Sequence, residues 1–247
     1  TIEDKAFLDC TDIQELNFPE GLEKIGNSAF ENNTNLKKIN IPSSLRTIET
    51  GAFSSTAISE LTVPPTLEKI GYGAFSGCTS LVKLTLPQSN LVIAGEAFSG
   101  CGIEELTIPA KLELAGPGIF QGNKSLKKVT IETGQTLAED IFTYCSALQS
   151  VTLPNGLGSI AKGAFSECKS LKNINLPLSL KEIEDSAFFE SGLTSIDIPD
   201  SVEYIGDSAF KQCEITKVRL PKSLKSTGKY IFAHCPITEI DFNGYSK

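Results

Sequence analysis

The sequence of 247 residues lacks a long apolar run, an excess of basic residues and most of the chemistry of a metal site. No stretch of about 18 apolar residues occurs, so no transmembrane helix is expected. The formal net charge is −8 at pH 7, which is not the basic footprint of a nucleic-acid-binding protein. A single histidine and the absence of a C-x-x-C spacing argue against zinc. We predict no metal, no cofactor, no nucleic-acid partner and no direct membrane insertion.

What the sequence has instead is a repeat anchored on phenylalanine. Eleven of the fourteen Phe residues recur at intervals of 22 or 23 positions, at Phe7, Phe30, Phe53, Phe75, Phe98, Phe120, Phe142, Phe165, Phe188, Phe210 and Phe232. A period of this length indicates a solenoid of stacked repeats. We predict one domain, residues 1–247, of eleven repeats. Because the chain starts without Met and partway through a repeat, we expect a fragment of a longer protein.

Other positions keep the same spacing as Phe. An alternating segment that ends in Pro, such as Leu84-Thr85-Leu86-Pro87, is typical of a half-buried strand. There is no room for a long amphipathic helix between this Pro and the next Phe. The segment around Ala-Phe can hold one helical turn or a short second strand, and the sequence does not decide between them.

The unit Leu-x-x-Ile-x-Ile-Pro-x-x-Leu-x-x-Ile-Gly-x-x-Ala-Phe-x-x-Cys resembles the BspA-like leucine-rich-repeat family. Half of it stands almost unbroken at Leu67, Ile70, Gly71, Ala74, Phe75 and Cys78, and the resemblance covers the whole chain. It implies an α/β-type leucine-rich-repeat solenoid, curved and β-rich. One long parallel sheet would lie on the concave side, with short turns, helical turns or short strands on the convex side. The resemblance also implies binding scaffolds, often on microbial or parasite surfaces, and brings no catalytic residues.

Departures from this unit gather between residues 115 and 134. Ala115 weakens the Ile column, Glu132 replaces the Pro that ends the strand, and Gly134 stands where a Leu is usual. We therefore expect an irregular stack in this region. We consider three interpretations of these departures: a bend in the solenoid, an evolutionary relic in the repeat, and a contact site.

All seven cysteines fall in one inward column, three residues after Phe, at Cys10, Cys78, Cys101, Cys145, Cys168, Cys213 and Cys235. Side chains in such a column run parallel instead of converging, so we predict protected free thiols and no disulfides. Four repeats carry another small residue there, which we expect to bond the backbone of a neighbouring loop: Asn33, Thr56, Asn123 and Ser191. His234, beside Cys235, is expected to be a surface residue.

A partner would bind the outward positions of the strands. One outward column alternates in charge through Glu15, Lys38, Glu60, Lys83, Glu105 and Lys128, and the alternation ends at Ser150, Asn173 and Ser195. Alternating charges neutralise their neighbours. We therefore predict the partner-binding surface where alternation lapses, in the adjacent outward column, at Thr152, Asn175, Asp197, Arg219 and Asp241.

The predicted function is a non-catalytic protein-binding or adhesion module, extracellular or on a cell surface. Its partner would be another protein, such as a host matrix or cell-surface protein. The alternative is a cytoplasmic leucine-rich-repeat scaffold, because seven free thiols fit a reducing compartment. A third hypothesis is a carbohydrate-active solenoid enzyme, since Asp197 and Asp241 should lie roughly 10 Å apart, near the carboxylate spacing of inverting glycosidases. Arg219 between them favours a salt-bridged ladder instead. The oligomeric state stays open.

Overall fold

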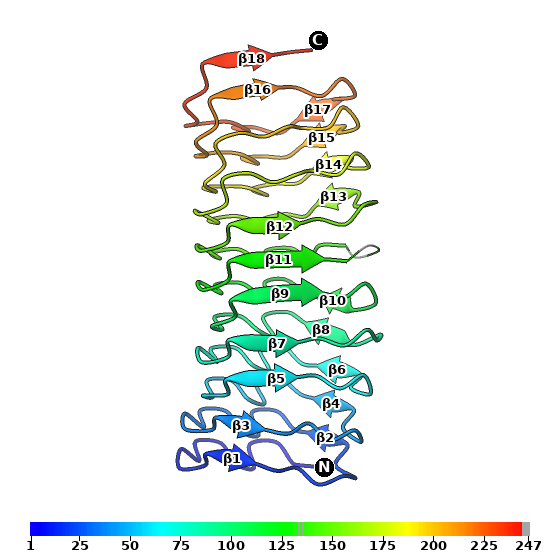
Figure 1. Ribbon diagram of the computed structural model, residues 1–247, viewed down its shortest axis with the longest axis vertical. Helices are drawn as coiled ribbons and strands as arrows, with labels where there is room; N and C mark the ends of the chain where they lie inside the picture. Colours follow the sequence, from blue (N-terminus) through cyan, green and yellow to red (C-terminus); the bar gives the residue numbers. More distant parts are fainter. Residues whose placement is uncertain (133, 135, 244–247) are drawn as a thin grey trace.

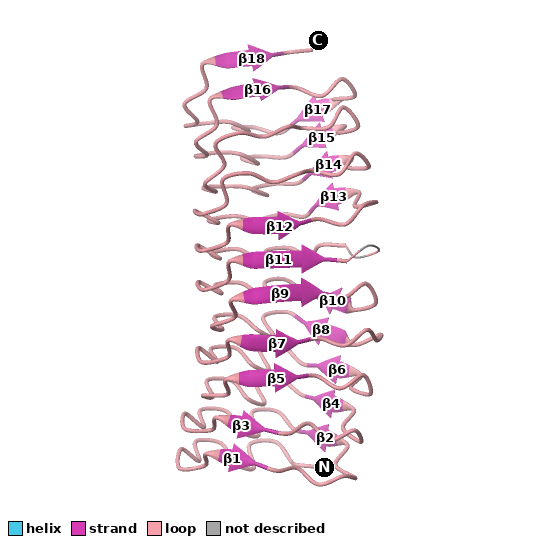
Figure 2. Ribbon diagram, in the orientation of Figure 1, coloured by secondary structure: helices cyan, strands magenta, loops and turns pink. Residues whose placement is uncertain are grey.

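The molecule is a ladder of stacked turns that runs from the N-terminus at one end to the C-terminus at the other (Figure 1). A computed structural model describes residues 1–132, 134 and 136–243. Within these residues every regular element is a short β-strand and none is a helix (Figure 2). The predicted β-rich solenoid is confirmed. The predicted α/β class and the predicted helical turns are wrong, because the described residues contain strands and turns only.

The alternating segments before each Pro form one side of the ladder, here called the strand face. The apolar residue of each segment, such as Leu61 or Leu106, is buried, and its polar neighbours are exposed. Strands pair in parallel, so that Thr62 lies beside Thr85. The strands of this face are β1 (Glu15–Leu16), β3 (Lys38–Ile39), β5 (Glu60–Thr62), β7 (Lys83–Thr85), β9 (Glu105–Ile108), β11 (Lys128–Ile131), β12 (Ser150–Thr152), β16 (Lys217–Arg219) and β18 (Glu239–Asp241).

The strand face is not one long sheet, contrary to the prediction. Its strands pair only as β1–β3, β5–β7, β9–β11–β12 and β16–β18, and residues 173–175 and 195–197 form no strand. Within the described residues, no backbone N–H or carbonyl group of 173–176 or 195–198 makes a hydrogen bond. Each turn is held on several sides at once, so pairing can lapse on one side while the others keep the turn in the stack.

A second side of the ladder also carries parallel strands, in the segment that leads back to Phe. They are β2 (Lys24–Ile25), β4 (Thr47–Ile48), β6 (Lys69–Ile70), β8 (Val92–Ala94), β10 (Glu113–Ala115), β13 (Ser159–Ile160), β14 (Glu182–Ile183), β15 (Tyr204–Ile205) and β17 (Ser226–Thr227). The first five form one sheet and the last four another. Between β10 and β13 lie residues 133 and 135, which are outside the described residues, and part of the stretch where the departures predict an irregular stack falls there.

The backbone around Ala-Phe is neither a helix nor a strand, although the sequence left both open. In every repeat the residue two before Phe and the residue two after it have positive φ, from Lys5 and Asp9 in the first repeat to Tyr230 and His234 in the last. This left-handed conformation costs a non-glycine residue roughly 1–2 kcal/mol. One such residue on each side of Phe prevents helical continuation, which is why no helical turn forms.

The same conformation turns three N–H groups of each repeat toward the next one. The N–H of Phe30 donates to the carbonyl of Ala52 at 2.8 Å, and the N–H groups two positions to either side make equivalent bonds. These three bonds recur at every junction between successive Phe residues, always in the same direction along the ladder. They form the uninterrupted side of the stack and offset the strain of the left-handed residues.

Phe rings fill the core between these sides. Rings of successive repeats stack with centroids 5.1–6.0 Å apart and planes within 18° of parallel. From Phe30 to Phe210 the ring column is buried, whereas Phe7 in the first repeat is 41% exposed. Burying one such side chain contributes roughly 1.5–3 kcal/mol. The Phe column predicted from the sequence is therefore confirmed as the centre of the core.

The Cys column ties each repeat to the one before it. The Sγ atom of Cys78 lies 3.2 Å from the carbonyl oxygen of Phe53. The same contact, at 3.0–3.3 Å, recurs at Cys101, Cys145, Cys168, Cys213 and Cys235. Where the column holds Asn123, the amide nitrogen donates to the carbonyl of Phe98 at 2.8 Å. The prediction that the small polar residues of this column bond a neighbouring backbone is confirmed for Asn33 and Asn123. It is wrong for Thr56, which bonds the carbonyl of Phe53 in its own repeat and the thiol of Cys78, and for Ser191, which contacts the thiol of Cys213.

All seven cysteines are free, but two of them are not buried. Cys10 and Cys235 are half-exposed because the first and last repeats described have a neighbour on one side only. Burial raises the pKa of the Cys145 thiol to about 12, whereas a hydrogen bond from Cys213 lowers the pKa of Cys235 to about 7. The prediction of seven protected thiols is therefore wrong at the two end positions.

We expect an alkylating reagent to modify Cys10 and Cys235 in the folded protein and to spare the five buried thiols. The rate at Cys235 should rise steeply around pH 7 and level off above about pH 8, because the thiolate is the reactive form and its pKa is lowered to about 7. Peptide mapping by mass spectrometry after short exposures measures the rates, with a denatured sample as control. Rapid native labelling of Cys78 or Cys168 would contradict the prediction.

Candidate binding face

The five candidate residues lie on the strand face, in its outward column. Arg219 lies beside Asp241 in the register of β16 and β18, and Thr152 ends β12. Asn175 and Asp197 belong to the two turns without strand pairing. All are exposed except Arg219, which is half-buried.

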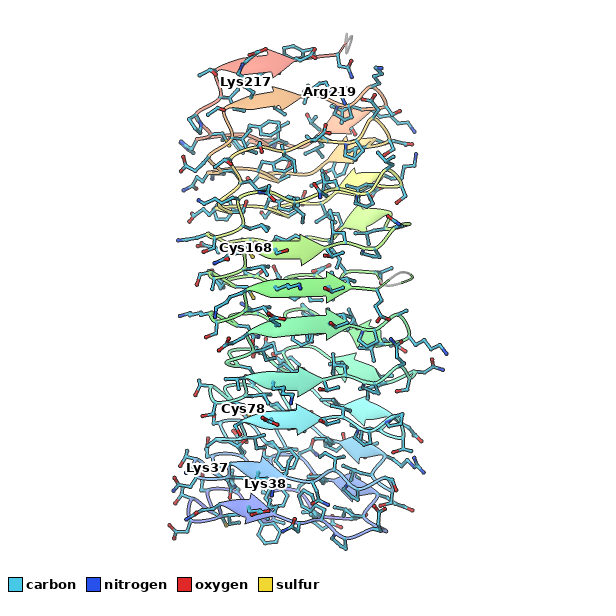
Figure 3. The ribbon with its side chains drawn as sticks, in the orientation of Figure 1. Lys37, Lys38, Cys78, Cys168, Lys217 and Arg219 are labelled. Atoms are coloured by element: carbon cyan, nitrogen blue, oxygen red, sulfur yellow. The ribbon has the colours of Figure 1, made fainter. Side chains whose placement is uncertain are left out.

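Opposite charges pair in the neighbouring outward column, as predicted, and the pairing resumes further along the ladder. The Nζ of Lys38 lies 3.1 Å from Oε1 of Glu15, and that of Lys217 lies 2.6 Å from Oε2 of Glu239. The second pair was missed from the sequence, although both residues keep the repeat spacing. Exposed pairs of this kind contribute about 0–1 kcal/mol each. Figure 3 shows Lys38 toward one end of the ladder and Lys217 toward the other. Charged pairs therefore lie on both sides of the neutral stretch, which consists of Ser150, Asn173 and Ser195.

The guanidinium of Arg219 is held mainly by Asp200. Its Nη1 lies 2.8 Å from Oδ1 of Asp200, while its Nη2 lies 4.0 Å from Oδ1 of Asp197. Asp200 also accepts a hydrogen bond from Nδ2 of Asn243 at 3.2 Å. The hydrogen bond from Arg219 lowers the pKa of Asp200, so this carboxylate stays charged near neutral pH. Asp200 was missed from the sequence because it lies in the corner after the strand, outside the outward column.

A shallow hollow of about 280 Å³ brings three of the five candidates together. Asn175, Asp197 and Arg219 all line it. Thr152 lines a separate hollow of about 580 Å³, and Asp241 lines neither. The predicted surface is therefore divided, with its centre at the turns that lack strand pairing.

Leu178, on the rim of this hollow, is a large apolar side chain that is exposed to solvent. It is 85% exposed and follows the Pro that ends its segment, at a corner where the neighbouring repeats carry Asn155 and Asp200. Leu176, half-buried, lines the same hollow. The hollow thus combines an apolar part with charged and amide groups, as binding sites commonly do. An apolar residue in this otherwise mostly polar corner is the sequence signal for it, and it lies outside the strand positions from which the candidate residues were predicted.

Glu132, where most repeats have Pro, links three turns of the ladder. Its Oε2 accepts hydrogen bonds from Nε2 of Gln88 at 2.7 Å and from the N–H of Ala110 at 3.2 Å. These hydrogen bonds lie within the protein, so the interpretation of this region as a contact site stays a prediction. The residue lines the hollow of about 580 Å³ and also borders a third hollow on the strand face, of about 320 Å³, over β7, β9 and β11.

The carboxylates of the enzyme hypothesis are engaged in local contacts. Asp241 accepts a hydrogen bond from the N–H of Asn243 at 2.8 Å, and Asp197 faces Arg219. In the part of the chain that the structure describes, no cluster of three or more His, Cys, Asp or Glu side chains could hold a metal ion. The described residues also contain no helix long and apolar enough to cross a membrane.

The stacked turns, parallel strands and columns of Leu, Ile and Phe together define a leucine-rich-repeat β-solenoid. A family model of the BspA-type leucine-rich-repeat region matches residues 1–127 and 135–246, in six copies. The chain belongs to the BspA-type leucine-rich-repeat family. The unmatched residues 128–134 include Glu132, the departure that bridges neighbouring turns.

Solved structures of bacterial proteins share this fold. A leucine-rich-repeat protein from Bacteroides ovatus is 28% identical with a TM-score of 0.57, over 97% of this chain and 52% of that one. The pneumococcal vaccine antigen PcpA is 26% identical with a TM-score of 0.62, over 92% of this chain and 67% of that one. This chain therefore spans about half the length of the Bacteroides protein. Comparison with curated proteins found no match.

Proposed function

We propose that this chain is a non-catalytic protein-binding module displayed on a cell surface, with another protein such as a host matrix or cell-surface protein as its partner. The observation that carries the proposal is the hollow that gathers Asn175, Asp197 and Arg219 beside the exposed Leu178. One structural relative is a vaccine antigen, which supports display at the surface.

Three features make this part of the strand face suitable for binding. Small neutral side chains at Ser150, Asn173 and Ser195 replace the charges found elsewhere in their column. The backbone groups of 173–176 and 195–198 are without hydrogen bonds in the described structure. The charged pairs on either side are already neutralised by their neighbours, so a partner would have to compete with them. Among the described residues that line the hollow, the ion pairs a partner would meet are those of Arg219 with Asp197 and Asp200 and that of Asp200 with Lys222.

The test begins with capture of partners from matrix or cell extracts and their identification by mass spectrometry. Surface plasmon resonance then compares two variants of the full chain. Combined substitution of Thr152, Asn175, Asp197 and Arg219 by Ala should weaken binding by roughly tenfold or more, the effect of losing one good contact centre. Combined substitution of Glu60, Lys83 and Glu105 should leave affinity nearly unchanged. Equal affinities of both variants and the unmodified chain would show that another surface binds.

A pair of single substitutions isolates the apolar part of the hollow. Leu178→Ser should weaken binding because it removes the exposed side chain on the rim. Val82→Ser is the matched control, since Val82 is 46% exposed elsewhere on the same face. Circular dichroism establishes that both variants are folded. The proposal fails for this hollow if the control loses as much affinity as Leu178→Ser.

A cytoplasmic scaffold is the second candidate, and the free cysteines favour it. A surface protein can also keep these thiols, since five of them are buried in the core. The sequence of the complete gene distinguishes the two candidates. A secretion signal or a surface anchor supports display, and their absence from the complete protein supports the scaffold.

A further inference from the structure

We propose that Asn155 is a site of spontaneous deamidation, which adds a negative charge beside the strand face. Asn155 and Gly156 form the exposed turn after Pro154, between β12 and β13. The proposal rests on the chemistry and geometry of this turn. It does not depend on the proposed function.

The reaction needs only water. The backbone nitrogen of Gly156 attacks Cγ of the Asn155 side chain, a new C–N bond closes a five-membered succinimide, and the side-chain nitrogen leaves as ammonia. Water then adds to either carbonyl of the ring. One opening gives Asp and the other gives isoaspartate, so the overall change consumes one water and releases one ammonia. Glycine in the second position helps because no Cβ obstructs the attacking nitrogen.

Both reacting groups are free in this turn. Within the described residues, neither the side chain of Asn155 nor the N–H of Gly156 has a hydrogen bond. A Cβ added at Gly156 would meet no atom within 4 Å, so the forming ring has open space. The equivalent corner of another repeat differs, because the N–H of Gly21 donates to Oγ of Ser44 at 2.9 Å. The turn at Asn155 lacks this restraint.

The chain contains an internal comparison, because Asn243-Gly244 is its one other Asn-Gly pair. The side-chain nitrogen of Asn243 donates to Oδ1 of Asp200 at 3.2 Å and to the carbonyl of Leu220 at 3.3 Å. Both bonds restrain the side chain of Asn243, whereas Gly244 lies outside the described residues. On the usual strength of such bonds, this slows Asn243 roughly tenfold or more relative to a free side chain.

The product changes one end of the candidate surface. Asn155 lines the hollow of about 580 Å³ together with Thr152 and Glu132, so the new carboxylate joins an existing one there. It also adds to a formal net charge that is already −8. If the proposed surface binds a partner, aged protein should bind an acidic partner more weakly. This consequence alone rests on the proposed function.

The experiment incubates the full chain in mildly alkaline buffer and follows both Asn-Gly peptides by mass spectrometry. Deamidation is read as the mass gain from exchanging NH₂ for OH, and isoaspartate is detected by enzymatic methylation. A synthetic peptide of residues 150–160 gives the unrestrained rate, and Asn155→Gln is the variant control. We expect Asn155 to convert at nearly the peptide's rate, roughly tenfold or more faster than Asn243. Asn155→Gln should abolish conversion in the proteolytic peptide that contains position 155. An unconverted Asn155 beside a converting peptide, or equal rates at the two sites, would overturn the proposal.

Discussion

Replacing Phe75 by Ala is expected to lower the free energy of unfolding by about 3–5 kcal/mol. The ring is fully buried and stacks between Phe53, at 5.3 Å, and Phe98, at 5.4 Å. Its removal leaves a cavity between two rings. The surrounding backbone cannot easily collapse into this space, because the N–H of Phe75 donates to the carbonyl of Ala97 at 2.8 Å and its equivalents hold the adjacent turns.

Chemical denaturation followed by far-ultraviolet circular dichroism measures the effect. Phe7→Ala should be milder, since Phe7 is 41% exposed and stacks on one ring only. Val82→Ala is the surface control, because Val82 is 46% exposed. A midpoint shift for Phe75→Ala no larger than that for Val82→Ala would mean that the ring column is not the main source of stability.

The core could be predicted because a solenoid is nearly one-dimensional. Each repeat contacts its neighbours alone, so residues at equal spacing in the sequence become neighbours in space. This placed Phe75 between Phe53 and Phe98, and it placed Asn123 in the column of buried thiols. A constant spacing therefore carries tertiary information here that most folds keep in contacts between distant segments.

The interruption of the strand face could not be predicted in the same way. Residues 173–175, Asn-Ile-Asn, alternate as regularly as residues 150–152, Ser-Val-Thr, yet only the second segment pairs as a strand. Alternation determines which side of a segment faces the core. Whether two backbones approach within hydrogen-bonding distance depends on how all sides of a turn fit together, which a local pattern does not contain.

The backbone around Phe was overlooked for a related reason. Glycine occupies some of the left-handed positions, such as Gly73 and Gly77, but Ser28, Glu96 and Tyr144 occupy the same positions in other repeats. The chemical types vary because the hydrogen bonds to the next turn use the backbone and not the side chains. A pattern of side-chain types therefore does not predict this ladder of backbone hydrogen bonds.

Three of the residues that line the hollow were predicted from the sequence, namely Asn175, Asp197 and Arg219. The outward column correctly gave exposed positions for Asn175 and Asp197. It could not give Asp200 or Leu178, because these belong to the corner after the strand, and their closeness to Arg219 depends on how that corner folds back. Sequence columns therefore describe the strands of this protein better than the corners that join them.

Loss of the buried amide at position 123 is the second large effect that we expect. Asn123→Ala should lower the free energy of unfolding by about 1–3 kcal/mol through an unpaired carbonyl alone, with a further contribution from the space left behind. The amide nitrogen of Asn123 donates to the carbonyls of Phe98 and Phe120, each at 2.8 Å. Within the described residues the carbonyl of Phe98 has no other hydrogen bond, so truncation leaves a buried acceptor without a donor.

Asn123→Cys is the matched variant, because the neighbouring repeats already use a thiol in this column. The Sγ atom of Cys145 contacts the carbonyl of Phe120 at 3.3 Å, and a thiol at position 123 should reach Phe98 in the same way. The change also removes Oδ1 of Asn123, which is buried without a partner. We therefore expect a loss below about 1 kcal/mol, measured by the same denaturation experiment. If Ala and Cys destabilise equally, the column stabilises the stack by packing alone, and the hydrogen bonds to the Phe carbonyls contribute nothing measurable.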